Sequence, residues 1–247
     1  MIKKITLPLL ASSLILTHTA NAEFKLGPIT ATPGIMYQTN YVGEFTGMIS
    51  NRSKPTYGVD LNLAHGSGLY LYNAFKEFKN ATDEDTINQY GTFDYELCSV
   101  AGFANKIQNL NFDISYENCN VDAKTEENTG TFYVRANADL TKTLNVGAAY
   151  AKSSTDGAIG EDDGDNLHKH SQDAFKFNAT YDLGVAKTTI AYGEANNLTK
   201  FTTLGLNKDF LGVNFDLTYW NVEAANWTGP DQSIDRELLV LSLKKTF

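Results

Sequence analysis

Histidine and cysteine are scarce in this 247-residue chain, which contains four histidines and two cysteines. His18 lies near the N-terminus, His65 lies in a short polar turn, and His168 and His170 lie in a long polar segment. None of them falls within a predicted strand beside a serine or an aspartate. Catalysis by a nucleophile and a histidine base requires direct hydrogen-bond contact between the two. We therefore expect no enzyme activity and no cofactor, although a pair of carboxylates is an alternative that this argument leaves open.

Long apolar runs are also lacking beyond the N-terminus. The stretch ITLPLLASSLIL at residues 5–16 has 12 residues, whereas a membrane-spanning helix needs about 20. It follows two lysines and precedes an A-x-A pattern that ends at Ala22. This arrangement is typical of a secretory signal. We predict a signal peptide at residues 1–22 and a single exported domain at residues 23–247.

Basic charge is in the minority. The chain has 29 acidic and 20 basic side chains, and two of the lysines lie in the predicted signal peptide. The exported part therefore carries 18 basic against 29 acidic side chains, a net charge of −11. Because nucleic-acid backbones are negatively charged and bind basic surfaces, we expect no nucleic-acid partner.

Helical heptads are absent from the exported part, and apolar residues alternate there with polar ones. In NFDISYE at residues 111–117, for example, aromatic and aliphatic side chains alternate with Asp, Ser and Glu. A period of two is typical of a strand with one apolar and one polar face. About twelve strands are predicted, at residues 29–40, 55–65, 68–78, 89–105, 109–120, 130–140, 143–153, 172–182, 185–194, 199–207, 211–223 and 236–247.

The connections between these strands alternate in length. Short turns such as HGSG, IQN and NKDF alternate along the chain with longer polar segments. A soluble β-sandwich also has two different strand faces, but it gives no reason for this alternation of loop lengths. An outer-membrane barrel has short periplasmic turns, longer external loops and an even number of strands. We predict an all-β fold, a single antiparallel transmembrane barrel of about twelve strands, surrounded by the outer-membrane lipid of a Gram-negative-type bacterium.

The last strand, ELLVLSLKKTF, ends on the aromatic residue Phe247. In a bilayer an unpaired sheet edge would leave backbone groups without hydrogen bonds. We therefore predict that the first and last strands pair and close the barrel. The strand resembles the C-terminal strand that outer-membrane barrels present to their assembly machinery, and Phe247 is the predicted assembly signal.

The two cysteines, Cys98 and Cys119, flank a short turn. If Ile107 pairs with Leu110 across this turn, paired positions sum to 217, and the two cysteines also sum to 217. An exported protein permits a disulfide. We predict a cross-strand disulfide, with two free thiols as the alternative because directly opposed strand positions suit disulfide geometry only with strain.

Charged side chains of both signs occupy the polar faces of the predicted strands. The residues expected to line a pore are Asp60, Asp94, Glu96, Asp113, Glu117, Arg135, Lys176 and Asp216. One interpretation is a water-filled channel with a mild cation preference, because lining charges set ion selectivity. The other is a polar core held together by salt bridges. The acidic segment GEDDGDNLHKH at residues 160–170 misses the spacing of a calcium loop, so no metal site is predicted.

Residues 39–75 resemble the opening of the TorF-like porin family, a bacterial family long treated as conserved proteins of unknown function. That family typically reads S-D-Y-x-F-R-G-x-S, then a proline, a glycine-rich strand and H-x-S-G-x-Y. The usual arginine is Thr46 here, and two residues are inserted before Phe45. The resemblance implies an outer-membrane barrel classed as a porin, and it supplies neither catalytic residues nor a substrate. The matching positions are Tyr41, Phe45, Gly47, Ser50, Pro55, Gly58, His65, Gly68 and Tyr70.

The sequence thus predicts a porin that allows passive diffusion of small hydrophilic solutes through a polar lumen. Two alternatives are kept open. The first is a plugged or narrow barrel with a structural, adhesive or receptor role through its external loops. The second, disfavoured by the shortage of histidine, is an outer-membrane barrel enzyme. The oligomeric state is not indicated by the sequence.

Overall fold

The structure, a computed structural model, describes residues 24–40, 55–78, 95–121, 127–156, 170–195, 199–224 and 236–247. These residues form one antiparallel sheet of thirteen strands. Among them there is no helix that could cross a membrane. The strands are β1 (Phe24–Leu26), β2 (Ile29–Gln38), β3 (Thr56–His65), β4 (Leu69–Phe78), β5 (Tyr95–Ile107), β6 (Leu110–Val121), β7 (Glu127–Asp139), β8 (Leu144–Asp156), β9 (His170–Asp182), β10 (Lys187–Ala195), β11 (Thr199–Phe210), β12 (Val213–Ala224) and β13 (Arg236–Thr246).

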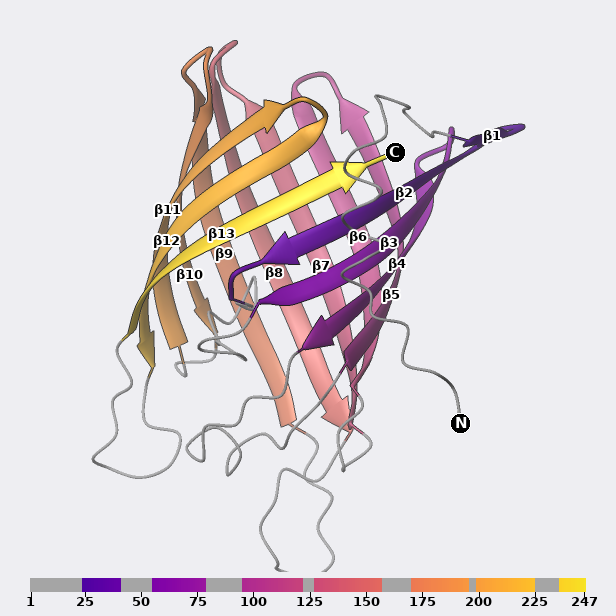
Figure 1. Cartoon of the computed structure of the whole chain (residues 1–247), viewed down its shortest axis with the longest axis horizontal. Coiled ribbons are helices and arrows are strands. Elements are labelled where there is room, and N and C mark those ends of the chain that lie inside the picture. The colour runs from indigo at the N-terminus through magenta and orange to yellow at the C-terminus, as the bar shows by residue number, and fades with distance from the viewer. Residues whose placement is uncertain are drawn as a thin grey trace, which may run out of the picture.

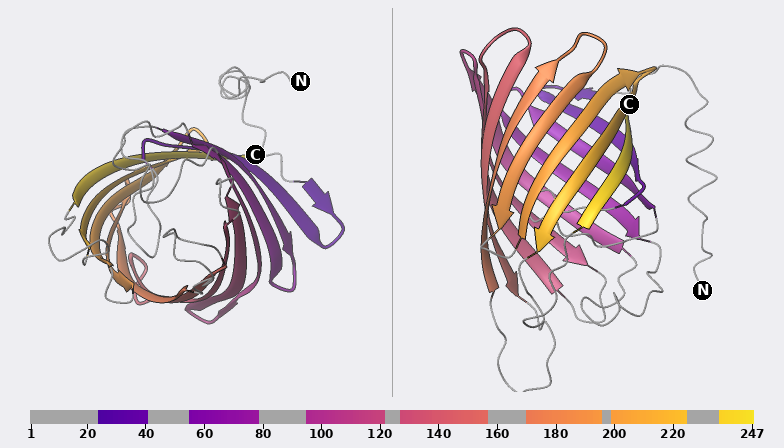
Figure 2. Two further views of the ribbon diagram at one scale, coloured as in Figure 1. Left: turned by 90° about the horizontal axis from the view of Figure 1, so that it is seen from below. Right: turned by 90° about the vertical axis from the view of Figure 1, so that its left-hand side faces the viewer.

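Twelve of these strands close into a barrel, as predicted. Each strand from β2 to β12 pairs with the next, and β13 returns to β2, with Ser242–Thr246 opposite Gly34–Gln38. Seen along its axis the sheet forms a ring, and seen from the side its strands are strongly tilted (Figures 1 and 2). The predicted strand positions are confirmed. The largest difference is at β5, which begins at Tyr95, because residues 89–94 lie outside the described part of the chain.

The sequence did not predict β1. This three-residue strand pairs with the beginning of β2, with Phe24 opposite Ala31. It lies on the same edge of β2 as β13, which pairs with the later residues Gly34–Gln38. Three residues are too few to show an alternation of apolar and polar side chains, so this pattern does not predict the strand. In Figure 1 the hairpin of β1 and β2 projects beyond the ring.

Short turns connect β3 to β4, β5 to β6, β7 to β8, β9 to β10 and β11 to β12, all at the upper end of the barrel in Figure 1. Leu211 and Gly212 between β11 and β12 both have positive φ angles, of 53° and 74°. Two successive positive φ values match the tight hairpin turn whose twist suits the flanking strands. The C-terminus lies at this same end.

Large apolar side chains cover the outer face of the sheet. Every second residue of the strands points outward, and the exposed residues at these positions include leucine, isoleucine and aromatic side chains all around the ring. An exposed apolar surface of this extent is costly in water, but it is the normal exterior of a barrel that spans a bilayer. Outward exposed examples, one or two from each of eight strands, are Val59, Leu71, Leu97, Ile114, Val134, Phe177, Ile190, Leu204 and Leu206.

Candidate functional site: the inner wall of the barrel

An ion pair between strands two apart identifies the inner face. Lys244 Nζ on β13 lies 3.0 Å from Asp60 Oδ2 on β3, although β2 runs between these strands. Gly34 of β2 lies beneath the pair, and a Cβ atom there would come within 2.7 Å of Asp60 Oδ1. Side chains converge over an intervening strand on the concave side of a closed sheet. The register then assigns every second residue of each strand to this side.

The register places seven of the eight expected pore-lining residues on this inner face. They come from β3, β5, β6, β7, β9 and β12, so they surround the lumen and do not form a single cluster. The eighth, Asp94, lies outside the described residues. The seven are Asp60, Glu96, Asp113, Glu117, Arg135, Lys176 and Asp216.

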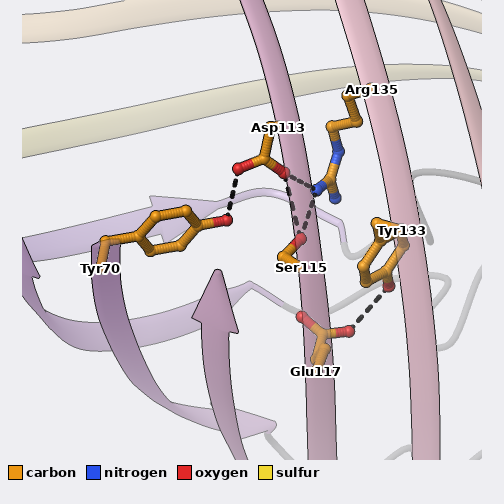
Figure 3. Close-up of polar contacts among 6 residues, drawn as sticks. All are labelled: Tyr70, Asp113, Ser115, Glu117, Tyr133 and Arg135. Atoms are coloured by element: carbon orange, nitrogen blue, oxygen red, sulfur yellow. Dashed lines mark hydrogen bonds and ion pairs between the residues drawn. The ribbon is translucent and has the colours of Figure 1, made fainter. Parts of the chain in front are cut away.

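Asp113 is the centre of a polar network that joins three strands (Figure 3). The Tyr70 hydroxyl on β4 donates a hydrogen bond of 2.7 Å to Asp113 Oδ2 on β6. Arg135 Nη1 on β7 donates to Asp113 Oδ1 at 3.0 Å and to Ser115 Oγ at 3.1 Å. The Asp113 carboxylate therefore binds Tyr70 on one side and Arg135 on the other. The hydrogen bonds to Asp113 and Ser115 orient the Arg135 guanidinium.

Gly102 of β5 makes the contact between Tyr70 and Asp113 possible. It stands opposite Tyr70 in the register, and a Cβ atom at this position would lie only 2.5 Å from the tyrosine ring. The ring can cross β5 because glycine has no side chain. A residue of any other type here would force the tyrosine away from β6.

Tyr133 extends the network along β7. Its hydroxyl donates a hydrogen bond of 2.8 Å to Glu117 Oε1, and the Arg135 Cζ atom lies 4.2 Å from the centre of its ring. The second contact is a cation–π interaction. The sequence analysis did not include Tyr133 or Tyr70 among the expected pore-lining residues, although Tyr133 shares the strand parity of Arg135 and could have been recognised from that alone.

Beside this network lie an ion pair and the two cysteines. Lys76 Nζ on β4 is 2.9 Å from Glu96 Oε2 on β5. Cys98 and Cys119 stand directly opposite each other, which is the predicted register, and the structure joins them in a disulfide with a Cα–Cα distance of 4.1 Å. Glu96 and the two sulfurs are close together, but both sulfurs belong to the disulfide, so neither is available as the thiolate that a metal would need.

The facing wall, formed by β11 and β12, is held mainly by uncharged donors. Asp216 accepts a hydrogen bond of 2.6 Å from the Thr218 hydroxyl. The amides of Asn207 and Asn214 bond each other at 2.8 and 3.1 Å. This wall is therefore polar but carries fewer charges than β4 to β7.

Toward the long-loop end of β10 to β13, the inner face becomes apolar. The Phe201 ring, only 1% exposed, lies over Gly193, where a Cβ atom would collide with the ring. It also lies 5.3 Å from the Trp220 ring. Ala195 and Val222 are likewise buried. The inner face is thus apolar at the long-loop end of β10 to β13, whereas β4 and β5 carry the Lys76–Glu96 ion pair near the same end. The sequence analysis did not make this distinction.

No protein-family model matches the chain, and no curated protein matches it. Solved structures do share its fold. The KdgM porin in complex with disordered oligogalacturonate is 10% identical, with a TM-score of 0.57 over 87% of this chain and 99% of that one. The NanC porin is 10% identical, with a TM-score of 0.51 over 87% of this chain and 98% of that one. The chain, whose barrel has twelve strands, therefore shares the fold of these porins.

Proposed function

We propose that this protein is an outer-membrane channel of the porin type, through which small hydrophilic solutes diffuse passively. The observation that carries the proposal is the contrast between the two faces of one closed sheet. Exposed leucine, isoleucine and aromatic side chains cover the outside, while aspartate, glutamate, lysine, arginine and asparagine line the inside. Such a wall suits a water-filled path through lipid.

The fold comparison supports the same conclusion at the level of architecture. The KdgM porin of similar fold was solved in complex with oligogalacturonate, a hydrophilic ligand. For this chain we propose the broader class of small hydrophilic solutes. The resemblance of residues 39–75 to the TorF-like porin family belongs to this proposal too, as do the signal peptide at residues 1–22 and delivery by the barrel assembly machinery.

A narrow or plugged barrel with a structural, adhesive or receptor role is the second candidate. The observation in its favour is the apolar inner face at the long-loop end of β10 to β13, where Ala195 and Phe201 are each only 1% exposed. Buried side chains on the lumen side are expected where the path is constricted. An enzyme has less support. Among the described residues His65 Nδ1 lies 2.7 Å from Ser67 Oγ, but this pair is exposed in the short turn between β3 and β4. The hydrogen bonds on the inner face join carboxylates to tyrosine, threonine and arginine.

Single-channel recording of the refolded exported chain in planar lipid bilayers separates the two candidates. Stepwise openings with a linear current–voltage relation are expected for the proposed channel. Folding is checked on the same sample by the change in gel mobility on heating that closed barrels show. A correctly folded protein that stays electrically silent would contradict the channel and support the plugged barrel.

A further inference from the structure

Away from the short-turn rim, where Lys106 pairs with Asp139, the inner side chains of β3 to β7 and β13 form what we call the charged wall. The ionic side chains that the structure describes there are four carboxylates and three cations. Three of the carboxylates each have a cation of their own. The distances are 3.0 Å for Asp60 and Lys244, 2.9 Å for Glu96 and Lys76, and 3.0 Å for Asp113 and Arg135.

Glu117 is the fourth carboxylate, and its partner is neutral. It accepts its hydrogen bond from the Tyr133 hydroxyl at 2.8 Å. Lys76 and Arg135 also act on it electrostatically, but each of them already holds another carboxylate. The described part of the charged wall therefore has one negative charge in excess, and the geometry assigns that excess to Glu117.

The position of Glu117 suits a role in selecting solutes. Its side chain is half-buried and points to the same side as the ion pairs of the charged wall. The Tyr133 hydroxyl fixes one carboxylate oxygen, and Arg135 lies against the face of the same tyrosine (Figure 3). The carboxylate is thus held in place by a donor that does not cancel its charge.

We propose that Glu117 is the side chain through which the charged wall contributes to charge selectivity, and that it favours small cationic solutes over anionic ones. This inference rests on the proposed channel function. A permeating cation would gain attraction near Glu117, whereas the three ion pairs nearby present little net charge. Tyr133 is a positioning residue, since it acts through the carboxylate that it holds.

The test is the reversal potential of refolded channels in a potassium chloride gradient. The wild-type channel is expected to favour potassium. A unit negative charge about 7 Å from an ion in water raises the occupancy of a cation about threefold and lowers that of an anion about as much, so Glu117→Gln should lower the potassium-to-chloride permeability ratio by roughly sevenfold. Glu117→Ala removes the same charge and serves if the glutamine variant does not refold.

The matched control removes an ion pair from the same wall. The double variant Lys76→Met with Glu96→Gln removes one charge of each sign, so its permeability ratio should stay at the wild-type value. Tyr133→Phe keeps the Glu117 charge and should keep the sign of the preference. A conducting channel whose ratio is unchanged in Glu117→Gln overturns this inference alone. A folded but silent wild-type protein overturns the channel proposal and this inference with it.

Discussion

The seam of the barrel, where β13 pairs with β2, and the wall opposite it, formed by β6 to β8, differ greatly in the length of their strand pairing. Along the wall, β6 and β7 pair over all of Leu110–Val121, and β7 and β8 pair over a similar length. At the seam, β13 pairs with β2 only over Ser242–Thr246. Because a bilayer offers no water to unpaired backbone groups, the seam is where closure has the least support.

Further backbone hydrogen bonds on either side of the five paired residues strengthen the seam. The Phe247 backbone N–H donates to the Pro33 carbonyl at 2.9 Å, and the Thr39 N–H donates to the Leu241 carbonyl at 3.0 Å. Beyond Pro33, β1 covers the same edge of β2 through Phe24 and its neighbours. Residues 24–26 and the C-terminal residues therefore meet on one strand, and closure depends on both segments.

Deleting Phe247 should have the largest effect. The deletion removes the hydrogen bond to Pro33 at the end of a five-residue pairing, together with the ring that lies 5.1 Å from Lys245 Nζ. We expect most of the protein to fail to close. The measurement is the fraction with heat-modifiable gel mobility after refolding into lipid vesicles, and the amount recovered in outer membranes.

Phe103→Ala is the matched control for that deletion. Phe103 is also an aromatic residue near the short-turn end, but it belongs to β5, which is paired with β6 from Glu96 to Ile107. Its loss should leave the folded fraction close to that of the wild type. The seam argument fails if the Phe247 deletion folds as well as Phe103→Ala does.

Removing the disulfide should have a smaller effect, because it lies in the fully paired wall. Cys98→Ser with Cys119→Ser should still close into a barrel and lose about 3 kcal/mol in the free energy of unfolding, the chain-entropy value for a 21-residue separation. Unfolding by urea in lipid vesicles measures this loss. In the wild-type protein, thiol titration without reductant should find no free thiol. Two free thiols would contradict the bond.

Most of the wall could be predicted from the sequence because alternation of polar and apolar residues is a local signal. It gave the twelve strands of the ring, the short turns and the inward direction of Asp113, Glu117 and Arg135. The register of β5 and β6 followed from one tight turn, which also placed Cys98 opposite Cys119. Each of these depends on residues close together in the chain.

Contacts that cross a strand could not be predicted in this way. Tyr70 reaches Asp113 only because Gly102 stands between them, and Lys244 reaches Asp60 only because the barrel closes over Gly34. Both contacts require the curvature of the finished sheet. The charge of Glu117 is in excess only because the other three carboxylates of the charged wall have cations as partners. Alternation alone does not reveal these partners, so in the sequence Glu117 was one of eight equivalent candidates.

The smallest predicted effect concerns the ion pair that spans the seam. The Asp60 side chain is 2% exposed, whereas that of Lys244 is 39% exposed. Lys244→Met leaves a buried carboxylate without its cation, and after allowance for screening of the exposed lysine we expect a loss of about 2 kcal/mol in the free energy of unfolding. Asp60→Asn leaves a lysine that can turn toward lumen water, so it should cost less.

Urea unfolding of both single variants and of the double variant measures this asymmetry and the coupling between the two residues. Lys106→Met is the control, because Lys106 pairs with Asp139 at the short-turn rim, where both side chains are largely exposed. It should change the unfolding free energy by no measurable amount. If Asp60→Asn cost as much as Lys244→Met, burial of the carboxylate would not be the reason for the asymmetry. The seam would then depend on its five backbone pairs and the chain ends alone.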